Sequence, residues 1–100
     1  MAPMAKGYWV VCYRSVSNPG ALAEYAKLAV PVIQSAGGHF LARGTAAKAY
    51  EAGKVERVVV IEFDSVEKAR ATYEGDAYQA ALKALIGAAE RDVRIVEGAA

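Results

Sequence analysis

Two short runs of β-branched and aromatic residues, YWVVCY and RVVVIEF, limit the folds open to this 100-residue chain. Such residues favour strands, and we expect strands over Tyr8–Arg14 and Val55–Phe63. A strand with one face in water alternates between apolar and polar residues, whereas these two runs are apolar on both faces. The sequence therefore predicts a sheet whose two faces are both covered.

A long helix is expected between these strands, from Pro19 to the residue before Gly37. Asn18 suits the N-cap, Pro19 suits the first helical position, and Gly37 is typical of a helix end. Apolar residues recur through the segment at helical spacing. Because Pro31 lies inside the segment, we predict a kink or bulge there.

The remaining segments complete the order of elements. GHFLARG and RDVRIVEG are expected strands, and two short helical patterns lie in the second half of the chain. Asp64 is the expected N-cap of the first helix, with Glu67 three residues later as in a capping box. Asp76 and Gln79 repeat this pattern for the second helix. The order β-α-β-β-α(α)-β predicts one α+β domain over residues 1–100, a ferredoxin-like antiparallel sheet with helices on one face.

The second face of this sheet needs a cover that the helices do not supply. The connections between the expected elements are too short to cover it, and a monomer rarely exposes a large contiguous apolar patch. A second copy packed sheet against sheet with two-fold symmetry is the economical solution. We therefore predict a homodimer.

The charge pattern argues against nucleic acid and anionic membranes as partners. The chain has 12 basic and 11 acidic residues, with the two signs interspersed and a net charge of +1. The opening residues, MAPMAKGYW, contain no apolar stretch of signal-peptide length, and no apolar run is long enough to cross a bilayer. We therefore expect a soluble, cytoplasmic protein.

Motifs for several chemistries are absent from the sequence. One histidine and one cysteine do not make a zinc site. The sequence contains no Gly-rich phosphate loop, no dinucleotide fingerprint and no GxSxG motif. We therefore expect no cofactor and no metal. The single cysteine, Cys12, is expected to be a small buried hydrophobe.

The strand GHFLARG carries the sharpest pair of candidate site residues. Alternation along a strand places His39 and Arg43 on one face. Arg43 stays protonated and could hold a carboxylate or enolate, while His39 could move a proton near neutral pH. The alternative interpretation is structural, with a histidine that bonds locally and an arginine paired with a carboxylate.

Arg57 and Glu62 lie on opposite faces of the central strand, and the strand register decides which of them joins His39. If Leu41 pairs with Arg57, then His39, Arg43 and Arg57 form a basic face suited to an anionic ligand. A slip of one residue brings Glu62 to that face instead. The sequence leaves both registers open.

Three tyrosines on helices are further candidates. Tyr25, Tyr73 and Tyr78 lie on the helix faces that are expected to meet the sheet. Each can pack in the core, or line a pocket and orient a ligand with its phenol. We expect Tyr73 or Tyr78 to lie near the strand that carries His39 and Arg43.

Several short motifs, in a given order and spacing, carry a family resemblance. They are Tyr25, Pro31, GGHFLARG at residues 37–44, RVVVIEFDS at 57–65, the A..TY that ends at Tyr73, AYQ at 77–79 and the final R.V.IVEG. Over residues 7–98 the chain resembles the family named domain of unknown function 1330, within the dimeric α/β-barrel superfamily. The resemblance implies a ferredoxin-like protomer that dimerises through its sheet and has a pocket near that sheet, with no particular substrate. Members usually carry Arg or Lys where this chain has His39.

Two classes of function remain open. The first is a cofactor-free enzyme, isomerase or monooxygenase-like, that acts on a small anionic or phenolic metabolite. The second is a non-catalytic homodimer that binds a small molecule or another protein. A solvent-open pocket that holds an arginine or His39 with a tyrosine favours the first class, and a pocket filled by side chains favours the second. The candidate residues are His39 for catalysis and Arg43, Arg57, Glu62, Tyr73 and Tyr78 for ligand binding.

Overall fold

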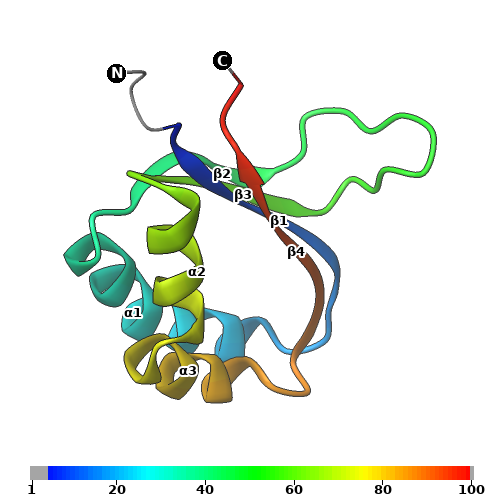
Figure 1. Cartoon of the computed structure of the whole chain (residues 1–100). Helices are drawn as coiled ribbons and strands as arrows, with labels where there is room; N and C mark the ends of the chain where they lie inside the picture. The colour runs from blue at the N-terminus through cyan, green and yellow to red at the C-terminus, as the bar shows by residue number, and fades with distance from the viewer. Residues whose placement is uncertain (1–4, 100) are drawn as a thin grey trace.

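The computed structural model describes residues 5–99 and has the ferredoxin-like α+β fold (Figure 1). Four strands form one antiparallel sheet in the order β2-β3-β1-β4. The predicted fold class and order of elements are therefore confirmed. The elements are β1 (Gly7–Val16), α1 (Pro19–Ser35), β2 (His39–Thr45), β3 (Arg57–Phe63), α2 (Val66–Glu74), α3 (Asp76–Leu82), the 3-10 turn η1 (Lys83–Leu85) and β4 (Ala89–Glu97).

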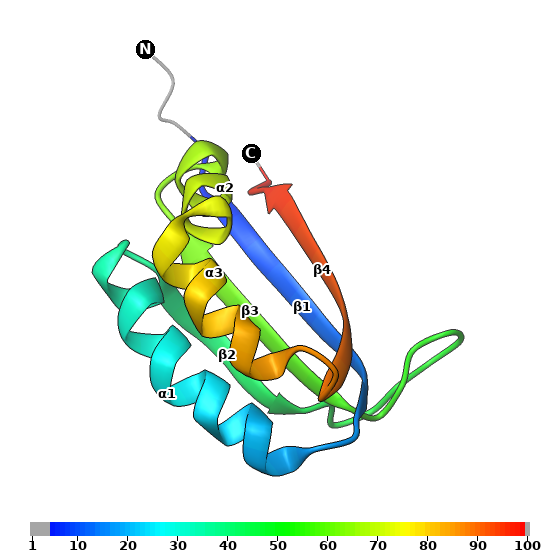
Figure 2. The same cartoon turned by 90° about the horizontal axis from the view of Figure 1, so that it is seen from below.

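The helices all lie on one side of the sheet, and within residues 5–99 no helix covers the other side, here called the outer face (Figures 1 and 2). Val10, Val58 and Val60 belong to the outer face and are only partly buried. Cys12 also lies there and is exposed in the single chain, so the expectation that it is buried in the core of that chain was wrong. Because side chains alternate along β1, its neighbour Tyr13 takes the core side and Cys12 does not.

The core between the helices and the sheet is built around Trp9, which is 1% exposed. Its ring centroid lies 5.1 Å from that of Phe63 and 5.0 Å from that of Tyr78. Its indole N–H donates to the backbone carbonyl of Ala69 at 2.8 Å, so the one polar atom of this side chain is satisfied. These contacts fix α2 and α3 against the sheet.

The first helix begins at the predicted residue and ends one residue before its predicted end. The side chain of Asn18 caps α1 by accepting a hydrogen bond from the N–H of Ala21 at 3.1 Å. The helix continues through Pro31 as one element of 17 residues. It ends before Gly37, whose φ of 86° lies in the left-handed region that favours glycine.

The caps of the two later helices differ from the prediction. Ser65, not Asp64, caps α2, and its hydroxyl accepts from the N–H three residues later at 3.0 Å. Gly75 takes the cap position of α3, so Asp76 is already the first helical residue. The Gln79 side chain donates instead to a backbone carbonyl near the end of α2, at 2.7 Å. α2 therefore begins one residue later, and α3 one residue earlier, than capping by Asp64 and Asp76 would place them.

A β-bulge at Leu41 interrupts β2. Before the bulge, His39 lies opposite Glu62 in β3, and after it Arg43 lies opposite Val59. The extra residue reverses the alternation of side chains along the strand. His39 therefore belongs to the outer face, whereas Arg43 faces the helices.

The bulge makes both predicted registers wrong. Arg57 pairs with Thr45 rather than with the residue of the bulge. Arg43 and Arg57 share the helix-facing side, and His39 shares the outer face with Glu62. The prediction that His39 and Arg43 lie on one face assumed unbroken alternation, and a single inserted residue breaks it.

Candidate functional site

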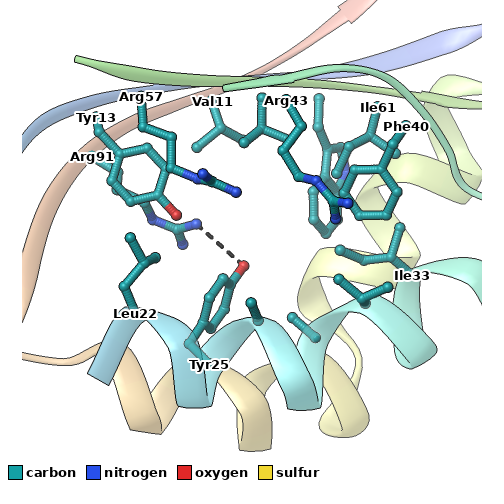
Figure 3. Close-up of a pocket in the computed structure, with 15 residues that line it drawn as sticks. Val11, Tyr13, Leu22, Tyr25, Ile33, Phe40, Arg43, Arg57, Ile61 and Arg91 are labelled. Atoms are coloured by element: carbon teal, nitrogen blue, oxygen red, sulfur yellow. Dashed lines mark hydrogen bonds between the residues drawn. The ribbon is translucent and has the colours of Figure 1, made fainter. Parts of the chain in front are cut away.

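A cavity lies between α1 and the helix-facing side of the sheet (Figure 3). Its volume is about 40 Å³, which is room for a few water molecules. Much of its wall is apolar and comes from β1, β3 and α1, including Val11, Ile33 and Ile61. Its polar wall consists of three arginines and two tyrosines.

The three arginines come from three different strands: Arg43 from β2, Arg57 from β3 and Arg91 from β4 (Figure 3). None of the described residues that line the cavity is acidic. Within residues 5–99, no salt bridge involves any of these guanidinium groups. Cations gathered beside an apolar wall are unfavourable unless an anion joins them. The cavity is therefore electrostatically suited to an anion.

Arg91 reaches the cavity because of the alternation along β4. It lies opposite Tyr13 of β1, on the side of the sheet that faces the helices. Val93 and Ile95 follow on the same side at alternate positions and pack against the core. Sequence reasoning missed Arg91 as a site residue. The signal was present, since a strand that buries Val93 and Ile95 must place Arg91 on the same face.

Arg91 bridges two phenols beside the cavity. It donates through one guanidinium nitrogen to the hydroxyl of Tyr25 at 3.3 Å and through the other to that of Tyr78 at 3.2 Å. The two hydroxyl oxygens lie 2.5 Å apart. The Arg91 guanidinium also lies over the rings of Tyr13 and Tyr25, 5.6 and 5.2 Å from their centroids. Aromatic rings and hydroxyls thus hold this half-buried cation, and none of its partners within residues 5–99 is a carboxylate.

The environment of Tyr25 keeps it protonated. Burial and the neighbouring Tyr78 raise the pKa of Tyr25 far above the ordinary value of a phenol, against the opposing effect of Arg91. A phenol with such a pKa is neutral throughout the physiological range. Tyr25 can therefore give a hydrogen bond to a ligand oxygen, but it cannot act as a base there.

Arg43 is held at the exposed rim of the cavity by an aromatic contact. Its guanidinium carbon lies 4.8 Å from the centroid of the Phe40 ring. Phe40 also lines the cavity, from the same strand but on the other side of the bulge. A cation–π contact of this kind positions the charge without neutralising it.

Three of the predicted site residues lie away from this cavity. Glu62 is on the outer face, where its carboxylate accepts a hydrogen bond from Tyr8 at 2.9 Å, and this bond raises the pKa of Tyr8. His39 is exposed on that same face. Tyr73 packs against the Trp9 ring with a centroid distance of 5.6 Å and belongs to the core.

The other predicted residues do come together. Arg43 and Arg57 line one cavity, and Tyr78 supports its wall through the hydrogen bond to Tyr25. A second, wider depression of about 550 Å³ lies along α1, α2 and α3. Its charged lining residues, Lys68 and Asp76, are of opposite sign, so it lacks the convergent charge of the first cavity.

Over residues 5–99, His, Cys, Asp and Glu nowhere gather in a group of three or more that could hold a metal ion. No helix in the same range combines the length and the apolar character that crossing a membrane requires.

Solved structures share this fold over nearly the whole chain. A protein of unknown function from Rhodopseudomonas palustris superposes with a TM-score of 0.76 at 16% identity, covering 96% of this chain and 84% of that one. A protein from Bacteroides fragilis, described as dimeric and ferredoxin-like, gives a TM-score of 0.62 at 12% identity, with 96% and 99% covered. At such identities the likeness establishes the fold alone.

A third similar structure is named "putative antibiotic biosynthesis monooxygenase" and comes from Caulobacter crescentus. Its TM-score is 0.59 at 14% identity, and the alignment covers 98% of this chain and 94% of that one.

The sequence comparisons point to one family. No curated protein matches the chain at a significant level. The family described as domain of unknown function (DUF1330) matches residues 6–99, which is nearly the whole sequence. The chain therefore belongs to the DUF1330 family.

Proposed function

We propose that this protein binds a small organic anion in the cavity between α1 and the sheet. The observation that carries the proposal is the convergence of Arg43, Arg57 and Arg91 on a cavity with no carboxylate among its described lining residues. Arginine suits this task because its planar group can hold a carboxylate through two parallel hydrogen bonds. A bound anion would offset part of the combined positive charge of these three side chains.

The cavity wall also limits the shape of the ligand. The volume of about 40 Å³ accepts a head group of carboxylate size without rearrangement. The body of a larger ligand would extend out of the cavity past the exposed side chain of Arg43 and would contact the ring of Phe40. The ligand class that fits is therefore a small acid with an apolar or aromatic body.

A cofactor-free reaction on that anion is one candidate activity. Two structural neighbours carry monooxygenase names, from Caulobacter crescentus and Nitrosomonas europaea. In this chain Tyr25 and Arg91 would stabilise negative charge that develops on a bound enolate or phenolate. His39, the predicted catalytic residue, lies on the outer face and would have no part in this cavity.

Binding without catalysis is the second candidate, and a specific observation favours it. None of the described residues that line the cavity is His, Asp, Glu, Lys or Cys. Proton abstraction needs a base within hydrogen-bond reach of the substrate. Among the described lining residues, the titratable side chains are the three arginines, Tyr13 and Tyr25, and arginine does not deprotonate.

We further propose that two copies pair through their outer faces. The support is the partly exposed Val10, Val58 and Val60 on a sheet face that no helix of residues 5–99 covers. Similar structures from Bacteroides fragilis and Thermobifida fusca are described as dimeric. The cavity lies on the opposite side of the sheet, so the pairing would leave it open.

Arginine side-chain signals in nuclear magnetic resonance test the binding proposal. Acetate, benzoate and inorganic phosphate are titrated at constant ionic strength while the Nε–H signals of Arg43, Arg57 and Arg91 are followed. We expect saturable shifts with at least one of these anions, and loss of binding in Arg57→Met. Arg70→Met, which removes an exposed cation on α2, is the matched control and should bind like the unmodified protein. Equal binding by Arg57→Met and the unmodified protein, or no saturable shift with any of the three anions, would overturn the proposal.

A further inference from the structure

The Tyr25–Tyr78–Arg91 cluster contains one more proton than its own acceptors can use. The two phenols carry two hydroxyl protons, and their oxygens lie 2.5 Å apart. Only one proton can lie between these oxygens. The other must find an acceptor elsewhere or remain unbonded.

Arg91 cannot accept the second proton. It donates to both hydroxyl oxygens, at 3.3 Å to Tyr25 and 3.2 Å to Tyr78, and a guanidinium has no acceptor. Within residues 5–99 neither phenol makes a further hydrogen bond. The spare O–H group therefore has no partner in the described part of the chain.

The position of the two rings decides which phenol holds the spare proton. Tyr78 is 1% exposed, its ring packs against those of Trp9 and Tyr73, and it is not among the described residues that line the arginine-lined cavity. Tyr25 lines that cavity, and its hydroxyl points from α1 toward the arginines (Figure 3). A buried hydroxyl without an acceptor is unfavourable. The O–H group that is left without an acceptor should therefore be the one that has open space beside it. Tyr78 then donates to Tyr25, and Tyr25 donates into the cavity.

We infer that Tyr25 is a ligand-contacting hydrogen-bond donor, that it accepts the hydroxyl proton of Tyr78, and that the head group bound here is a fully deprotonated oxyanion such as a carboxylate or enolate. This inference rests on the proposed anion-binding function and deepens it. The polar wall then consists of three guanidinium groups and the Tyr25 O–H, all of which donate. The Tyr13 hydroxyl can donate as well as accept. A head group that must itself donate on several sides, such as a primary amide or an ammonium group, has too few acceptors here.

The pair Tyr25→Phe and Tyr78→Phe tests this assignment with acetate as the probe. Each variant removes one oxygen from the same pair of rings, and each leaves Arg91 with one phenol partner. In Tyr25→Phe the cavity loses its neutral donor, so acetate binding should weaken by about tenfold or more, as for a lost hydrogen bond to a charged group. In Tyr78→Phe the Tyr25 proton still points into the cavity, so the dissociation constant should stay within about threefold of the original.

The outcomes separate this inference from the binding proposal. If the unmodified protein binds acetate, Arg57→Met does not, and the two phenylalanine variants bind equally, then the assignment of Tyr25 is wrong and the anion site stands. If neither the unmodified protein nor Arg57→Met binds acetate, both proposals fail. Should Tyr25→Phe not fold, the 13Cζ signals of the unmodified protein answer the question. Acetate should shift the Tyr25 signal more than that of Tyr78, and the reverse order would overturn the inference.

Discussion

The guanidinium of Arg43 lies 4.8 Å from the ring centroid of Phe40, across the bulge of β2. This contact holds a cation at the rim of the cavity through an aromatic face, so the charge stays available to a ligand. An ion pair in the same place would have to break before an anion could bind.

Phe40→Leu should therefore weaken anion binding while leaving the fold intact. Loss of an exposed cation–π contact of about 0.5–1 kcal/mol frees the Arg43 side chain, so the dissociation constant should rise about two- to fivefold. Titration of the variant with the anions named above measures this, and a thermal melt confirms that it is folded. An unchanged dissociation constant would show that the aromatic contact does not position Arg43.

Arg57→Met and Arg91→Met should separate binding from stability. Arg57 has no salt-bridge partner within residues 5–99, so its removal should relieve repulsion and leave the free energy of unfolding unchanged or higher, while anion binding is lost. Arg91 donates to two phenols, so its removal should also lower the free energy of unfolding, by about 2 kcal/mol. Urea denaturation of both variants provides the comparison, and equal destabilisation by the two substitutions would contradict it.

Tyr25 should make stability fall at alkaline pH. Its pKa in the folded protein lies above the value of 10.0 for a free phenol, chiefly because it is buried. Above pH about 10 the unfolded chain loses this proton and the folded chain keeps it, so the unfolded state binds fewer protons and stability decreases as pH rises. The expected contribution is about 1.4 kcal/mol per pH unit.

Denaturation between pH 8 and about 11.5 in the unmodified protein and in Tyr25→Phe checks this prediction. Subtraction of the two curves removes the effect of the other titrating groups. The difference should be flat below pH about 9.5 and should grow above it. A flat difference over the whole range would show that Tyr25 ionises equally in both states.

Neighbouring valines on β3 should respond differently to the same substitution. Val59 is 7% exposed and faces the helices, so Val59→Arg should prevent folding by placing an unpaired charge in the core. Val60 is on the outer face, so Val60→Arg should stay folded and sediment as a monomer, with faster thiol labelling of Cys12. Sedimentation measures whether the protein is a dimer, and circular dichroism measures whether it is folded. A dimer that persists in Val60→Arg would contradict pairing through the outer face.

The order and type of the elements could be predicted from the residues because their signals are local. Asn18 and Gly37 mark the ends of α1, and the predicted strand runs recur in the structure with ends shifted by one to a few residues. The expected caps at Asp64 and Asp76 were wrong, since Ser65 and Gly75 offer equivalent positions one residue away. Choices between adjacent cap positions depend on how each helix packs, which no short stretch of sequence records.

The candidate site was only partly predictable. Arg43, Arg57 and Tyr25 were named and do line one cavity, whereas Arg91, which was not named, adds to its polar wall from the last strand. The contact between Arg91 and Tyr25 joins residues 66 positions apart, so it arises only when β4 and α1 pack against the same layer.

Periodicity along the chain specifies which segments become strands and which face of a helix is apolar, because these patterns depend on neighbours a few residues away. The side of the sheet on which His39 and Arg43 lie depends on one extra residue at Leu41. A bulge is stabilised by pairing with a partner strand and by packing on both faces, so these interactions exist only in the folded molecule. The three arginines of the cavity lie on three different strands, so they come together only when the sheet has formed.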